Sequence, residues 1–103
     1  MHISVEGQIR RLAHSYVRHG GKRNRRQQVG RLVAACTWIA ANHGLNKIDQ
    51  IGKRQVIDFY RHHREMANGT LMGYFYAFAE LWEWLGRQGD PPRPRLSSTT
   101  IED

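Results

Sequence analysis

Apolar residues recur at helical spacing in four stretches of the chain, separated by glycine-containing breaks. Apolar side chains three and four residues apart share one face of a helix, so each stretch predicts an amphipathic helix. No stretch shows the alternation typical of strands. The sequence therefore predicts an all-α fold, a small four-helix bundle. The expected buried positions are, in chain order, Val5, Ile9, Leu12, Ala13 and Tyr16; Val29, Leu32, Val33, Cys36, Ile39 and Ala40; Val56, Phe59, Tyr60 and His63; and Leu71, Tyr74, Phe75, Phe78, Leu81, Trp82 and Leu85.

Side chains that cap helices mark where these helices are expected to begin. Ser4 is placed to cap the first helix. Asn24, with Gln27 three residues later, predicts the start of the second helix. Thr70 is the expected cap of the fourth helix, which is apolar around most of its girth and is therefore expected at the centre of the bundle.

Glycine and proline mark the expected helix ends. Gly20-Gly21 ends the first helix, and Gly44 is placed for a left-handed stop after the second. The third helix is expected over residues 53–66, after a loop anchored by Ile48 and Ile51. The sequence Gly-Asp-Pro-Pro at 89–92 ends the fourth helix, so residues 1–90 are expected to form one helical domain. Residues 91–103 are expected to be a disordered tail or linker, because they lack periodicity.

Charge changes this picture most between Gly7 and Ile48, where nine Lys or Arg residues occur without a single Asp or Glu. The whole chain has a formal net charge of +7. Such a one-sided surface favours a polyanion partner, of which a nucleic-acid backbone is the commonest. The densest part, Lys22, Arg23, Arg25 and Arg26, falls at the expected start of the second helix, with Arg31 just beyond.

Cations are intrinsically unfavourable at a helix amino terminus, because the helix dipole already places partial positive charge there. A bound phosphate reverses this effect, since amides and guanidinium groups then both favour the anion. We therefore predict phosphate contacts at this helix start, against the alternative of a solvated basic loop. Lys53 and Arg54 begin the third helix, and Arg61, His62 and Arg64 end it. Asp58 and Glu65 are interleaved there, so nucleic-acid contact and a solvated face remain equal alternatives.

Catalytic and metal-binding patterns are absent from the sequence. The single cysteine allows no internal disulfide and fits a reducing cytoplasm, and no run is long and apolar enough for a membrane span. The six histidines and Cys36 lack the paired spacing of structural zinc ligands. No nucleophile motif or phosphate-binding glycine loop occurs. We expect a cytoplasmic binding module without cofactor, metal site, membrane partner or catalytic residue.

Most aromatic residues fall on the apolar faces and are expected in the core. Trp38 is off the main face of the second helix, beside small residues that favour approach of the first helix. Tyr76 and Trp84 are off the main face of the fourth helix. These three side chains either contact a partner or close a second packed face.

The order of features from Val5 to Pro94 resembles the amino-terminal, SAM-like core-binding domain of tyrosine recombinases and phage integrases. The similarity rests on the basic approach to an aliphatic helix (Arg25 to Ile39), an isoleucine-bearing loop and helix (His43 to Tyr60), a Thr-led helix rich in leucine and aromatic residues (Gly69 to Leu85), and a Gly-x-Pro-Pro exit. The chain departs from the family pattern at Gly52 and at Ala67-Asn68, where the family often has Ser or Thr.

The resemblance implies a role in DNA integration and recombination. The family's domain forms half of a clamp around duplex DNA, so the helix starts at Arg25 and Thr70 are expected to face DNA. The family's catalytic domain, with its tyrosine nucleophile, is absent from this chain, so we expect no strand cleavage. A catalytic recombinase domain or other integrase subunits are expected partners by the same resemblance. The alternatives are a protein-interaction module and a non-specific nucleic-acid-binding module.

Overall fold

The computed structural model describes residues 3–16 and 22–96, with the side chains of Tyr16, Lys22 and Arg23 left undescribed. This part of the chain is all-helical and contains no strand, which confirms the predicted fold class. Four α-helices and one short 3₁₀ turn make up the domain. They are α1 (Val5–Tyr16), α2 (Lys22–His43), η1 (Ile48–Gln50), α3 (Lys53–His62) and α4 (Asn68–Trp84).

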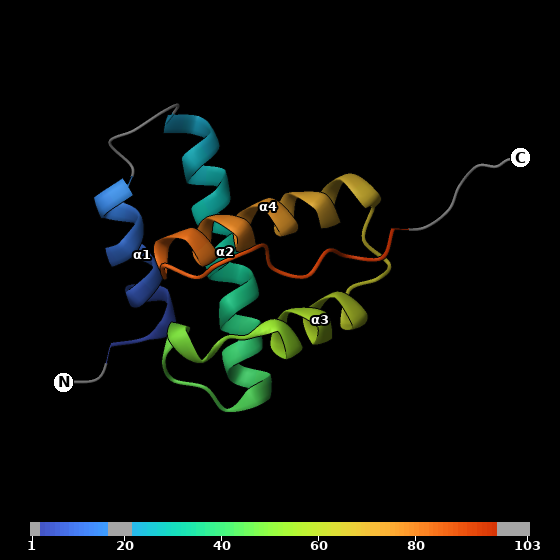
Figure 1. Cartoon of the computed structure of the whole chain (residues 1–103), viewed down its shortest axis with the longest axis horizontal. Helices are drawn as coiled ribbons and strands as arrows, with labels where there is room; N and C mark the ends of the chain where they lie inside the picture. The colour runs from blue at the N-terminus through green and yellow to red at the C-terminus, as the bar shows by residue number, and fades with distance from the viewer. Residues whose placement is uncertain (1–2, 17–21, 97–103) are drawn as a thin grey trace, which may run out of the picture.

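The long helix α2 is the element against which the other three helices pack. Figure 1 shows α1 lying antiparallel to α2, and α3 and α4 crossing α2 at two levels. An extended segment then leaves the end of α4 and runs back between α3 and α4 in this view (Figure 1). The result is a small helical bundle with its core along α2.

Most of the predicted apolar positions form one core. The apolar faces of α1, α2, α3 and α4 meet there, and the loop residues Ile48 and Ile51 are buried with them, as expected. Burial of this apolar surface is what stabilises so short a chain. The fully buried or nearly fully buried side chains include Ile9, Leu32, Cys36, Ile39, Ile51, Val56, Leu71, Phe78 and Leu81.

The start of α1 matches its prediction. The Ser4 side-chain oxygen accepts a hydrogen bond from the backbone N–H of Gly7 at 3.1 Å, as a helix cap does. About one helical turn after Ser4, Gln8 ties α1 to the loop before η1. Its amide nitrogen donates to the carbonyl oxygen of Asn46 at 2.8 Å, and its amide oxygen accepts from the N–H of Ile48 at 2.9 Å.

The starts of α2 and α4 differ from their predictions. The helix α2 begins at Lys22, so Asn24 lies within the helix and does not cap it. Lys and Arg are good helix formers, and the helix includes Lys22 and Arg23. Ala67, with extended backbone, precedes α4, which begins at Asn68. Thr70 therefore lies in the first turn of α4, and its assignment as the cap is wrong.

The end of α3 also differs, because the helix stops at His62 and not at Met66. The backbone N–H of His63 bonds to the carbonyl oxygen of Tyr60, one residue closer than in an α-helix. The carbonyl oxygen of Phe59, which a continuing helix would use, instead lies 2.7 Å from Nδ1 of His63. A histidine ring thus takes the place of the backbone donor, and turns follow.

Two glycines with left-handed backbone end the longer helices. Gly44 has φ 66° and the N–H of Leu45 bonds to the carbonyl oxygen of Ala40, which confirms the predicted stop of α2. The same arrangement ends α4 at Gly86, with φ 70°, and the N–H of Arg87 bonds to the carbonyl oxygen of Trp82. The prediction that α4 continues to Gly89 is therefore wrong.

The segment after α4 packs against the helices as far as residue 96. Pro91 and Pro94 are buried. The hydroxyl group of Tyr60 donates a hydrogen bond to the carbonyl oxygen of Pro92 at 3.1 Å. The guanidinium group of Arg93 lies 4.6 Å from the ring centre of Phe75. The remainder of the predicted tail, residues 97–103, lies outside the described residues.

Trp38 faces α3 and not α1, which corrects the expectation from the sequence. Its ring centre lies 5.7 Å from that of Phe59, 5.2 Å from that of His62 and 5.0 Å from that of His63. Helix α3 lies along this side of α2, so the second face of α2 that Trp38 occupies is a packed face within the domain. Trp38 is half-buried as a result.

Candidate nucleic-acid interface

The eight residues predicted to contact DNA lie in three separate places. Lys22, Arg23, Arg25, Arg26 and Arg31 belong to the first half of α2, Lys53 and Arg54 to the first turn of α3, and Thr70 to the first turn of α4. The first turn of α2 contains no acidic residue. The start of α2 carries the most basic residues of the three places, and its surroundings are therefore described first.

Antiparallel packing brings the last turns of α1 beside the first turns of α2 (Figure 1). We call this region the hairpin end, defined by His14, Lys22, Arg23 and Arg26. His14 and Arg26 are exposed. The side chains of Lys22 and Arg23 lie outside the described residues, and so does the whole of Arg18. The basic start of α2 thus lies beside the last turn of α1.

A carboxylate of α4 approaches the start of α2. Glu6, in the first turn of α1 and so at the other end of that helix, accepts a hydrogen bond from Nε of Arg10 at 2.9 Å. Glu80 of α4 lies 3.9 Å from Nη1 of Arg25, and both side chains are largely covered. Arg25 therefore serves the packing of α2 against α4 as well as the charge of the helix start. The sequence could not show this pair, because Glu80 is distant along the chain.

Arg31 is also committed to packing. Its Nη1 donates a hydrogen bond to Oε1 of Gln28 at 3.3 Å. Its guanidinium group lies so close to Gly73 that a Cβ atom there would be 2.9 Å from Cζ of Arg31. Arg31 thus covers a glycine on α4. Its guanidinium group, predicted from the sequence to contact DNA, lies between α2 and α4.

Lys53 and Arg54 are exposed but lie toward the opposite end of α2. Nε2 of His43, the last residue of α2, lies 2.9 Å from Oδ2 of Asp58 in α3. Arg26 and His43 are separated along α2 by about 25 Å, from the rise of an α-helix. A single phosphate cannot contact both helix starts, although a duplex that spans several base pairs can. Thr70, exposed in α4, belongs to a third location.

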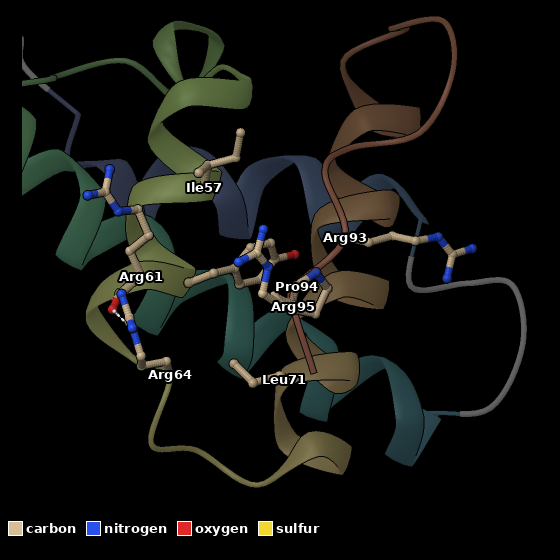
Figure 2. A pocket seen from close by; sticks show the side chains of 8 residues that line it. Ile57, Arg61, Arg64, Leu71, Arg93, Pro94 and Arg95 are labelled. Carbon is tan, nitrogen blue, oxygen red and sulfur yellow. Dashed lines mark hydrogen bonds between the residues drawn. The ribbon is translucent and has the colours of Figure 1, made fainter. Parts of the chain in front are cut away.

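The structure adds one basic region that the sequence pattern did not show. A groove of about 430 Å³ lies between the end of α3 and the extended segment after α4. We call it the arginine groove and define it by Ile57, Arg61, Arg64, Leu71, Pro94 and Arg95 (Figure 2). Arg95 falls in the segment expected to be a tail, so only its packing against α3 reveals that it belongs with Arg61 and Arg64.

Nucleophilic side chains of the core are held in unreactive settings. Burial raises the pKa of the Cys36 thiol to about 12. Burial also raises the pKa of Tyr60, whose hydroxyl is bonded to Pro92. Tyr74 packs with its ring centre 5.1 Å from that of Phe59. These three residues contribute to packing.

Neither a metal centre nor a membrane span is found in the described part of the chain. No group of three or more His, Cys, Asp or Glu side chains there is arranged to hold a metal ion. No helix within residues 3–16 or 22–96 combines the length and apolar content that crossing a membrane requires. Comparisons with protein families, curated proteins and solved structures find no match to this chain.

Proposed function

We propose that this protein is a duplex-DNA-binding module that holds the phosphate backbone at the hairpin end and does not cleave it. The observation that carries the proposal is the basic start of α2, whose first turn contains no acidic residue. Within α1 and α2 the sequence supplies Glu6 as the only acidic residue. Phosphate is the anion that such a surface fits best.

The chemistry of the start of α2 supports backbone contacts. The first N–H groups of an α-helix have no partner within the helix, and the dipole favours an anion there. The basic residues of the first turn add charge-assisted hydrogen bonds to the same anion. Contacts of this kind position a protein on DNA without selecting a base sequence. The proposed binding is therefore strongly dependent on salt concentration.

A role like that of an integrase core-binding domain is the more specific form of this proposal. It rests on the resemblance of residues 5–94 described above. In that form the module holds DNA for a catalytic recombinase domain or other integrase subunits. The proposal that the chain does not cleave DNA rests on the same resemblance, since the family's catalytic domain is not matched in this sequence.

The alternative of a protein-interaction module predicts that Trp38 or Trp84 is exposed in an apolar patch. Both side chains are half-buried and pack against the core. Tyr76, at 54% exposure, is the off-face aromatic that remains accessible. A single exposed aromatic side chain is ordinary for a protein surface. The aromatic residues therefore give this alternative no specific support.

An NMR titration with a short duplex at two salt concentrations tests the proposal. We expect backbone shifts concentrated at the end of α1 and the start of α2. The variant Arg26→Gln is expected to lower the slope of log K against log salt by about 1, because one phosphate contact is lost. Lys47→Gln removes one positive charge from the exposed loop before η1 and is the control, with an unchanged slope.

Two further measurements complete the test. Arg54→Gln determines whether the start of α3 shares the same duplex. Competition between duplex DNA and single-stranded RNA separates the proposed role from non-specific nucleic-acid binding. Equal slopes for Arg26→Gln and the unsubstituted protein, or shifts that avoid the hairpin end, would falsify the assignment of this surface.

A further inference from the structure

The arginine groove combines two properties that a phosphate-binding surface does not need. Its floor is apolar, formed by Leu71, Pro94 and the ring of Tyr60. Ile57, which lines the same groove, keeps 46% of its surface exposed. An exposed aliphatic side chain beside an apolar floor gains most from an apolar partner.

The rim of the groove is cationic. Arg61 comes from the last turn of α3, Arg64 from the turn that follows it, and Arg95 from the segment after α4 (Figure 2). Within residues 3–16 and 22–96, no carboxylate lies at ion-pair distance from these three guanidinium groups. The nearest acid on this helix, Asp58, is held by His43 at 2.9 Å and by His62 at 3.4 Å. Among the described residues these three guanidinium groups thus have no paired carboxylate.

The groove is formed before any partner arrives. Pro91 and Pro94 are buried, and Tyr60 holds the carbonyl oxygen of Pro92. The guanidinium group of Arg93 stacks on Phe75 and points away from the groove (Figure 2). These contacts fix the segment that presents Arg95 opposite Arg61. A partner therefore does not have to order this wall of the groove when it binds.

We propose that the arginine groove is a docking site for an acidic peptide segment of a partner protein, with an aliphatic side chain seated on the apolar floor. Carboxylates of the segment pair with Arg61, Arg64 and Arg95, while its aliphatic side chain contacts Ile57 and Leu71. A volume of about 430 Å³ accommodates one or two large side chains and not a folded element. The backbone of a duplex presents phosphate and sugar and has no flexible aliphatic side chain to seat on this floor, so charge and shape together favour the peptide.

This site is independent of the proposed DNA contacts. The arginine groove lies at the end of α3, whereas the hairpin end lies at the opposite end of α2 (Figure 1). One molecule can therefore hold DNA and an acidic partner at the same time. The chain would then act as an adaptor that recruits the owner of the peptide to DNA.

The test measures binding of a fluorescent synthetic peptide in which Asp and Glu alternate with Leu. A second peptide carries Asn and Gln in place of the acids, and a third carries Ser in place of Leu. We expect the first peptide to bind at least about tenfold more tightly than either of the others. Arg61→Glu is expected to weaken the first peptide by about tenfold or more, and Ile57→Ser by about threefold or more.

Arg26→Glu is the matched control, because it makes the same change of charge on an exposed helical arginine outside the groove. It is expected to leave peptide affinity within about twofold, the effect of long-range attraction at physiological salt. Arg61 and Ile57 are exposed, so circular dichroism is expected to show unchanged helicity for both groove variants. NMR shifts at the methyl groups of Leu71 and Ile57 locate the peptide directly.

Three results would overturn the proposal. The first is equal weakening by Arg61→Glu and Arg26→Glu, which indicates attraction by net charge alone. The second is equal binding of the acidic and amide peptides. The third is displacement of the peptide by a short duplex together with loss of duplex affinity in Arg61→Glu, which identifies the groove as a nucleic-acid surface. Loss of DNA binding in Arg26→Glu with peptide binding retained would support two separate sites for DNA and peptide.

Discussion

The guanidinium group of Arg87 donates a hydrogen bond to the backbone carbonyl oxygen of Ile51, joining the end of α4 to the loop before α3. Its second terminal nitrogen donates to the carbonyl oxygen of Asp49 at 2.9 Å. The same group lies 4.5 Å from the ring centre of Trp82. Arg87 therefore satisfies two loop carbonyl groups and covers an aromatic ring of the core.

Replacing Arg87 by Ala is expected to lower the free energy of unfolding by about 2 kcal/mol. Two charge-assisted hydrogen bonds and a cation–π contact are lost, while water replaces part of the hydrogen bonding. Urea denaturation monitored by circular dichroism measures the change. Arg54→Ala, an exposed arginine on a helix, is the control and is expected to stay within about 0.5 kcal/mol. Equal stabilities for the two variants would contradict the role of Arg87.

Two glycines are expected to respond to alanine in opposite directions. Gly30 lies within α2, and a Cβ atom there meets nothing within 4 Å. Gly30→Ala is therefore expected to raise the free energy of unfolding by about 0.5–1 kcal/mol through helix propensity. Gly44 has φ 66° with equally open surroundings, so Gly44→Ala is expected to lower it by about 1 kcal/mol through backbone strain alone.

Thermal denaturation of the two alanine variants beside the unsubstituted protein measures both changes in stability, the expected gain in Gly30→Ala and the expected loss in Gly44→Ala. Because both Cβ positions are open, steric clash does not enter either comparison. A loss of stability in Gly30→Ala would show that the helix is not regular at this position.

Stability is expected to fall with rising pH above about pH 9, with Cys36 as one cause. Burial raises the pKa of its thiol from the ordinary value of 9.0 to about 12. Between these values the unfolded chain loses the proton and the folded chain keeps it, so unfolding is favoured as pH rises. The limiting slope for one such group is about −1.4 kcal/mol per pH unit. Below pH 9 the thiol is protonated in both states and contributes no slope.

The variant Cys36→Ala isolates this contribution, because Tyr60 is buried as well and acts in the same direction. Urea midpoints at pH 8 and pH 10 are expected to differ less in the variant than in the unsubstituted protein. Alkylation of the folded protein by iodoacetamide at pH 8 is expected to be slow, and fast in urea. Identical pH dependence with and without the thiol would refute this account.

The faces of the helices were predictable because periodicity is a local property of the sequence. Leu32, Cys36 and Ile39 lie in the core as their spacing requires. The helix ends were less predictable, because several residues compete to form each end. Asn24 is a good cap in isolation, yet Lys22 and Arg23 extend the helix past it, and Gly86 ends α4 before the prolines are reached.

The candidate sites depend on contacts between distant residues, and here the sequence is less informative. It located the basic start of α2 but gave no sign that Glu80 approaches Arg25. The sequence also suggested that α1 approaches α2 near Trp38. The small residues beside Trp38 allow close packing of a helix but do not determine which helix packs there. The arginine groove requires knowledge that the segment after α4 returns along α3, which periodicity cannot supply because the segment has none.

The central position of α2 has a consequence for how the domain unfolds. Each of the other three helices packs on α2, so none of them keeps its apolar face covered once α2 separates. Partial opening that spares a stable remainder is therefore unfavourable, and the domain is expected to lose its structure in one cooperative step. The backbone amides of Ala35 to Ile39 then exchange with solvent only through global unfolding, so their exchange rates report the stability of the whole domain.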